Sequence, residues 1–190
     1  MAVRTFVALE LPEALLEGIL RLIHQLRDSG IRASWSGRGT LHVTLKFLGD
    51  VEERELPRVV EAVAAASAQV PPFSFETTRL GGFPSPRNPR VLWVGVTPVD
   101  ELLELQEALE TELAAIGFAR ERRRFHPHIT VGRIRGRAPE ATGEIISGLD
   151  APRGTVDVTE TRVMRSTLDP RGAIHELVKA VPLGGEKTDA

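Results

Sequence analysis

The segment LHVTLKFLG, residues 41–49, gives the pattern from which the fold is deduced. Apolar and polar residues alternate along it, β-branched and aromatic residues are frequent, and a glycine ends it, which together predict a β-strand. Side chains of a strand point alternately to its two faces. One face is polar and carries His42, Thr44 and Lys46. The other face is apolar, and we expect it to lie in the core: Val43, Leu45 and Phe47.

A second copy of the polar pattern occurs in HITV, residues 128–131. His128 and Thr130 are again two residues apart, so they share one face of a strand predicted over residues 127–134. A single histidine on a strand is usually structural. Two matched His-x-Thr pairs in one chain indicate a catalytic site.

The order of the predicted elements also repeats. A strand, a helix, a His-x-Thr strand, a helix and a further strand occupy residues 1–80, and the same order recurs over residues 90–183. We therefore predict one domain over residues 1–184 with an internal duplication, followed by a disordered tail at 185–190. The predicted fold class is α+β: a bilobal, pseudo-two-fold arrangement of two mainly antiparallel sheets backed by helices, with a central cleft between the lobes.

Composition is typical of a soluble globular protein, with 42% apolar and 26% charged residues. No apolar run reaches the length of a membrane span and the start lacks a signal-peptide pattern, so we expect a cytoplasmic monomer without membrane contact. The absence of cysteine excludes disulfides, thiolate catalysis and cysteine-bound zinc.

The net charge of −2 argues against nonspecific coating of nucleic acid. Positive charge is nevertheless concentrated around the second His-x-Thr pair, where Glu121 is the only acid among seven arginines: Arg120, Arg122, Arg123, Arg124, Arg133, Arg135 and Arg137. By itself this cluster is typical of a solvated loop.

Two facing His-x-Thr pairs suit the cleavage of a phosphodiester without a metal. One group must take a proton from the attacking oxygen, another must give a proton to the leaving oxygen, and donors must hold the non-bridging oxygens. Histidine suits the first two roles because its ordinary pKa lies near neutrality. The hydroxyl groups of Thr44 and Thr130 can donate to the phosphoryl oxygens. The residues alone do not say which histidine is the acid.

At these positions the sequence resembles the 2H phosphoesterase superfamily, which is defined by two His-x-Thr/Ser-apolar tetrads. It is most similar to the RNA 2′,3′-cyclic phosphodiesterases, also called 2′-5′ RNA ligase-like proteins. The similarity covers nearly the whole chain. It includes RTFVALELP at 4–12, PRVLWVGV at 89–96 and, around the second tetrad, FHPHITVGR at 125–133. Both tetrads are intact.

The resemblance implies hydrolysis of RNA ends or oligonucleotides bearing a 2′,3′-cyclic phosphate to 2′-phosphomonoesters, with no cofactor and no metal. It also implies that His42 donates a proton to the leaving 3′ oxygen and that His128 accepts a proton from water. Proteins of this group are further associated with reversible 2′-5′ RNA ligation. We rank ligation below hydrolysis for two reasons. Water competes with an RNA end for the cyclic phosphate, and the sequence contains no nucleotide-activating motif.

Three other residues are candidates for substrate contacts. Lys46 shares the predicted face of His42 and can bind phosphate, although an exposed strand lysine explains it equally well. Phe125 can stack on a base or pack in the core. Arg133 lies by parity on the face opposite His128, so a phosphate contact requires the strand to bend or end there. His175 is interpreted as a packing or surface residue.

Two alternatives of a different kind remain. One alternative is a metal site with His42, His126 and His128 as ligands. No carboxylate accompanies either motif at ligand spacing, and a metal site would not explain the two threonines. The chain can also be a non-catalytic module that binds RNA ends or nucleotides in the same cleft. The sequence leaves the physiological substrate open among long RNA, tRNA halves, 2′-5′ oligonucleotides and small cyclic nucleotides.

Overall fold

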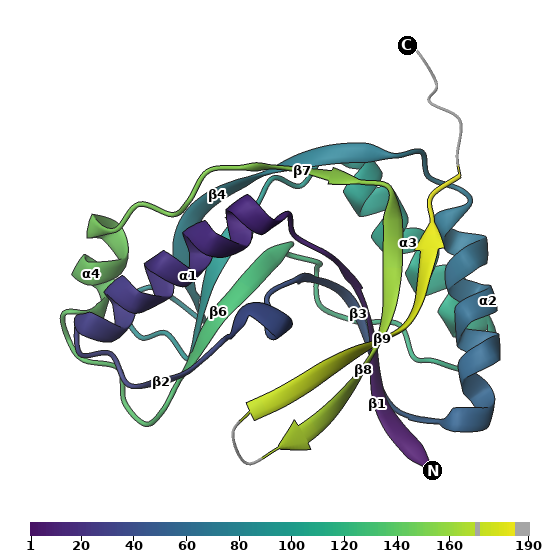
Figure 1. The fold of residues 1–190 in the computed structure, drawn as a ribbon, viewed down its shortest axis with the longest axis horizontal. Helices are drawn as coiled ribbons and strands as arrows, with labels where there is room; N and C mark the ends of the chain where they lie inside the picture. Colours follow the sequence, from purple (N-terminus) through teal and green to yellow (C-terminus); the bar gives the residue numbers. More distant parts are fainter. Residues whose placement is uncertain (170–171, 185–190) are drawn as a thin grey trace.

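A computed structural model describes residues 1–169 and 172–184 (Figure 1). The strands are β1 (Ala2–Leu9), β2 (Ala33–Trp35), β3 (Val43–Glu52), β4 (Phe73–Phe83), β5 (Val91–Val96), β6 (His128–Ile134), β7 (Thr155–Val158), β8 (Glu160–Asp169) and β9 (Gly172–Pro182). The α-helices are α1 (Glu13–Asp28), α2 (Leu56–Ser67), α3 (Asp100–Ala115) and α4 (Thr142–Gly148). The disordered tail predicted at 185–190 lies outside the described residues.

The strands form one curled antiparallel sheet in the order β7-β4-β5-β6-β3-β1-β8-β9, and β2 pairs with β6 beside this path. The order is symmetric about the centre: β5, β4 and β7 follow outward from β6, and β1, β8 and β9 follow outward from β3. At the centre, Val43 of β3 pairs with Ile129 of β6. The predicted α+β class is confirmed, and its two halves join through this central pairing.

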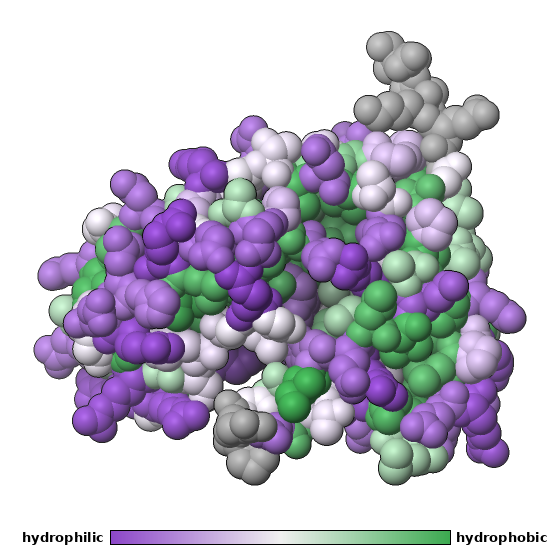
Figure 2. All heavy atoms as spheres, viewed as in Figure 1, coloured by the Kyte–Doolittle hydropathy of each residue, from purple (hydrophilic) through white to green (hydrophobic). Residues whose placement is uncertain are grey.

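Each half of the sheet is backed by helices. α2 and α3 pack on each other and cover the half that contains β1, β3, β8 and β9, whereas α1 and α4 lie on the other half (Figure 1). The apolar residues of α1 recur at helical spacing, and Ile19, Leu22 and Leu26 are buried in the core. Hydrophobic side chains reach the surface beside β9 and α2 (Figure 2). Within residues 1–169 and 172–184, no helix is long and apolar enough to cross a membrane.

A β-bulge in β3 reverses its alternation after the first motif. Across from β3, Ala8 lies opposite Thr44 and Val7 lies opposite Lys46, so Leu45 is an extra residue. An extra residue moves the side chains that follow it to the other face, as far as the next irregularity of the strand.

The bulge has opposite consequences for the next two side chains. Lys46 is 5% exposed and lies on the core side, while Phe47 is 65% exposed and its ring lies 6.0 Å from that of Phe6. Two predictions are therefore wrong: Lys46 does not share the face of His42, and Phe47 does not lie in the core.

β6 contains a matching bulge after the second motif. Trp93 of β5 lies opposite Thr130 and Leu92 lies opposite Gly132, so Val131 is the extra residue. Arg133 therefore returns to the face of His128, at the position equivalent to Phe47, and it is exposed. The prediction that Arg133 lies on the face opposite His128 is therefore wrong, because the extra residue Val131 reverses the alternation.

Candidate active site

The central strand pair brings the two His-x-Thr motifs together. Val43 and Ile129 are both fully buried beneath the sheet. Extending their antiparallel register by one residue places His42 beside Thr130 and Thr44 beside His128, all on the opposite face. From strand geometry, the Cα atoms of the two histidines are on the order of 8 Å apart.

Each histidine is oriented by a backbone carbonyl two residues before it. The Nδ1 atom of His128 lies 2.7 Å from the carbonyl oxygen of His126. His42 makes the equivalent hydrogen bond to the backbone of Thr40, and its Nε2 lies 3.0 Å from Oγ1 of Thr44. With Nδ1–H donating to a carbonyl, Nε2 is the ring nitrogen that is left to accept or donate a proton.

Burial keeps both imidazoles neutral at neutral pH. The pKa of His42 is lowered to about 4, first by burial and then by the positive charge that His175 and His128 can carry, while the hydrogen bond to Thr40 raises it. Burial also lowers the pKa of His128, and the charge of Arg133 adds to this effect. A bound anion would raise both pKa values, because it stabilises the imidazolium form.

An aromatic ring from a neighbouring strand flanks each histidine. Phe6 of β1 stacks on His42 with 4.9 Å between ring centroids, and Phe83 of β4 meets His128 edge-on at 5.2 Å. Trp93 packs against Phe83 at 5.1 Å. The sequence did not identify these rings as part of the site, because only strand pairing brings them to the motifs.

A third histidine also lies at the site. His175 of β9 has its ring centroid 5.2 Å from that of His42 and 4.9 Å from that of Phe6. Its Nδ1 is buried and has no hydrogen-bond partner among the described residues. The interpretation of His175 as a packing or surface residue overlooked this contact with His42.

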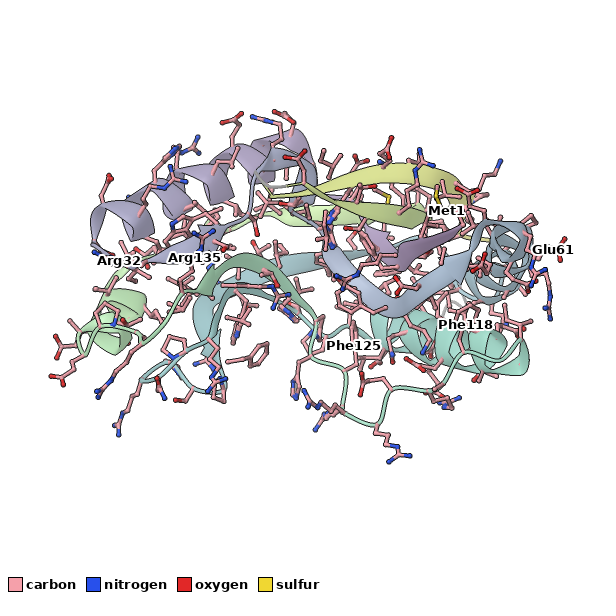
Figure 3. All side chains as sticks on the ribbon, turned by 90° about the horizontal axis from the view of Figure 1, so that it is seen from below. Met1, Arg32, Glu61, Phe118, Phe125 and Arg135 are labelled. Atoms are coloured by element: carbon pink, nitrogen blue, oxygen red, sulfur yellow. The ribbon has the colours of Figure 1, made fainter. Side chains whose placement is uncertain are left out.

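The remaining candidates differ in position. The Lys46 ammonium is engaged away from the site, 2.7 Å from Oε2 of Glu110 and 2.9 Å from the carbonyl oxygen of Ala119. Phe125 is half-buried against the core, at the end of the loop that joins α3 to β6 (Figure 3). Arg133 lies close enough for its charge to affect the pKa of His128. Within the described chain, no group of three or more His, Cys, Asp or Glu residues is arranged to hold a metal ion.

Comparisons with known proteins agree on one class. Residues 12–170 match the 2′-5′ RNA ligase superfamily, so the chain belongs to that superfamily. A Methanothermobacter thermautotrophicus protein named RNA 2′,3′-cyclic phosphodiesterase is 36% identical over 92% of this chain and 96% of its own length. A Thermotoga maritima protein of the same name is 34% identical over 92% of each chain. The resemblance stated from the sequence is confirmed.

Solved structures share the fold. TT0787 of Thermus thermophilus superposes with a TM-score of 0.78 at 26% identity, covering 96% of this chain and 99% of that one. LigT of E. coli in its apo form gives a TM-score of 0.75, also at 26% identity, covering 96% and 98%. The curled sheet with helices on its outer side is therefore the fold of this group.

Proposed function

We propose that the chain hydrolyses RNA 2′,3′-cyclic phosphodiester ends to 2′-phosphomonoesters by metal-independent acid–base catalysis. The observation that carries the proposal is the symmetric placement of His42 and His128 on one face of neighbouring strands. Each has its Nδ1 side held by a carbonyl and lies beside a threonine. Relatives that match over nine-tenths of the chain are named RNA 2′,3′-cyclic phosphodiesterase.

In the proposed reaction, Nε2 of His128 removes a proton from water as the water oxygen attacks phosphorus. The bond between phosphorus and the 3′ oxygen breaks, and His42 donates a proton to that oxygen. The products are a 2′-phosphate and a 3′-hydroxyl; His42 ends neutral and His128 ends protonated, and exchange with solvent resets both. The assignment of donor and acceptor follows the family resemblance. Each such group typically contributes about 10²–10⁴ in rate.

In this proposal, the negative charge of the substrate controls the protonation of His42. Because the pKa of free His42 is about 4, the acid is deprotonated at neutral pH until an anion binds. The cyclic phosphate carries a negative charge, which raises that pKa and couples protonation of the acid to substrate binding. Thr44 and Thr130 donate to the non-bridging oxygens, and Arg133 adds positive charge on the same face.

We propose that a monomer suffices and that no cofactor takes part, since one chain supplies every named group. The matching bulges and carbonyl contacts support an internal duplication of residues 1–80 and 90–183 within one domain. Phe125 stays a candidate for base stacking, through the part of its ring that is exposed.

The test is turnover of a 2′,3′-cyclic nucleotide by the wild type and by the double variant His42→Ala/His128→Ala, with and without excess EDTA. We expect turnover by the wild type that EDTA does not change and that the double variant abolishes. Turnover that survives the double substitution contradicts the acid–base proposal, and loss in EDTA supports a metal site. Binding without turnover supports the non-catalytic module.

A further inference from the structure

The loop over residues 116–127 joins α3 to β6 and ends at the second His-x-Thr motif. Figure 3 shows Phe118 and Phe125 near its two ends. Between them, Arg122, Arg123 and Arg124 are consecutive and exposed. Arg124 precedes His128 by four residues, so their Cα atoms are at most about 14 Å apart even along a fully extended chain. This arginine loop (Arg122, Arg123 and Arg124) is therefore joined to the site by a chain segment of only a few residues.

A buried ion pair fixes the start of this loop. Glu110 of α3 is 3% exposed, and its Oε2 accepts from the ammonium of Lys46 at 2.7 Å and from the backbone N–H of Glu121 at 3.0 Å. Lys46 also donates to the carbonyl of Ala119 at 2.9 Å. Since Lys46 follows the first motif in β3, these bonds tie the loop to the strand that positions His42.

The nearby acids are already engaged within the loop and its helix. Arg120 is paired with Glu107 at 2.5 Å. The carboxylate of Glu121 accepts from the backbone N–H groups of Arg122 at 2.9 Å and Arg123 at 3.0 Å, and the Arg123 contact is the main reason for its lowered pKa. Among the described residues, no salt bridge within 4.0 Å and no side-chain hydrogen bond involves the guanidinium groups of Arg122, Arg123 or Arg124. The charge of Arg123 does act on Glu121, where it contributes to the lowered pKa of that carboxyl.

The side chains beyond the arginines connect the loop to the site. His126 lies 6.4 Å from Phe83, whose ring contacts His128 at 5.2 Å. Exposed arginines together with aromatic rings are the combination by which proteins hold single-stranded nucleic acid, with cations on the phosphates and rings on the bases. A 2′,3′-cyclic phosphate closes the 3′ end of an RNA, so every other phosphate of that strand lies on its 5′ side.

We propose that the arginine loop binds backbone phosphates of the RNA strand on the 5′ side of the cyclic end. The preferred substrate is then a polynucleotide rather than a free cyclic mononucleotide. This inference rests on the proposed function for its choice of substrate, but it concerns a surface outside the catalytic groups.

The test compares two substrates for the variant Arg122→Ser/Arg123→Ser/Arg124→Ser: a 2′,3′-cyclic mononucleotide and an oligonucleotide of about ten residues with a cyclic end. We expect kcat/KM for the oligonucleotide to fall about tenfold or more, with the mononucleotide unchanged within about twofold. For the oligonucleotide, the slope of log kcat/KM against log salt concentration should become less negative by about 2. Each neutralised phosphate of a single strand contributes about 0.7 to that slope, and the variant removes three positive charges.

A matched control removes three exposed arginines elsewhere: Arg21→Ser/Arg27→Ser/Arg153→Ser. It should leave both substrates unchanged. The inference is overturned if the arginine-loop variant loses no more activity on the oligonucleotide than on the mononucleotide, or if the control loses as much. If the wild type turns over neither substrate, the proposed function fails. Fluorescence anisotropy of the labelled oligonucleotide then decides the inference: weaker binding by the loop variant alone supports it, and equal binding overturns it.

Discussion

Val43 and Ile129 pair directly across β3 and β6, and both side chains are fully buried. Because the strands run antiparallel, the residues on either side of this pair place the histidine of each motif beside the threonine of the other. A packed apolar pair beneath the sheet thus holds the polar groups above it in register. The proposed chemistry depends on this alignment of two motifs that are distant in sequence.

The two threonines should contribute to catalysis through their hydroxyl groups. We expect Thr44→Val or Thr130→Val to lower kcat for a 2′,3′-cyclic nucleotide by about 10², the typical effect of removing one donor to a developing oxyanion. Thr→Ser at either position should retain most activity. Circular dichroism and thermal unfolding check that the valine variants are folded. Equal kcat for the Val and Ser variants would exclude the donor role.

The pH dependence should shift when substrate binds. In the free protein, burial lowers the pKa of His42 to about 4 and lowers that of His128 below its usual value. The bell-shaped profile of kcat/KM, which reports the free enzyme, should therefore have its maximum below pH 6.5. The bound phosphate raises both pKa values, so the optimum of kcat should lie at higher pH. Identical optima, or a flat profile between pH 5 and 9, would contradict this account.

His175 should depress the pKa of His42 at acidic pH. Its ring lies 5.2 Å from that of His42, and its charge is the second largest cause of the lowered pKa, after burial. Replacing His175 by Phe keeps a ring in place and removes the charge. An NMR titration should then show the pKa of His42 above about 4.

The matched control for this titration is His24→Phe, at an exposed position on α1. It should leave the pKa of His42 unchanged. An unchanged titration in the His175→Phe variant would show that the two rings are not electrostatically coupled.

Replacing only one partner of the Lys46–Glu110 ion pair should lower the free energy of unfolding. Both side chains are almost fully buried, so Lys46→Met leaves an uncompensated carboxylate and should lower the free energy of unfolding by about 3–5 kcal/mol. The double variant Lys46→Met/Glu110→Leu should recover much of that loss. Urea unfolding measures both. Lys179→Met, at an exposed lysine, should stay within about 0.5 kcal/mol of the wild type. A loss in Lys46→Met no larger than in this control would mean that the buried pair is not required.

The fold class and the placement of both His-x-Thr pairs in one site could be predicted from the sequence, because they follow from local alternation and from a repeated order of elements. The prediction of which face a side chain occupies was wrong where a strand contains one extra residue. The bulges at Leu45 and Val131 exchange the faces of the residues that follow them directly, and strict alternation therefore misplaced Lys46, Phe47 and Arg133.

Residues contributed by other strands were also missed, for a different reason. Phe6, Phe83 and His175 reach His42 and His128 through strand pairing over long sequence distances, and no spacing within the chain encodes that contact. The order of the repeated elements pointed to two related halves. The pairing of Val43 with Ile129 became visible only in the folded sheet.

The most direct test of the two-histidine account is hydrolysis of an RNA with a 2′,3′-cyclic end in excess EDTA, followed by ³¹P NMR of the product. The wild type should give a 2′-phosphomonoester, and His42→Gln and His128→Gln should each lower the rate by about 10² or more while remaining folded. A 3′-phosphate product, or a rate that either substitution leaves unchanged, would contradict the account.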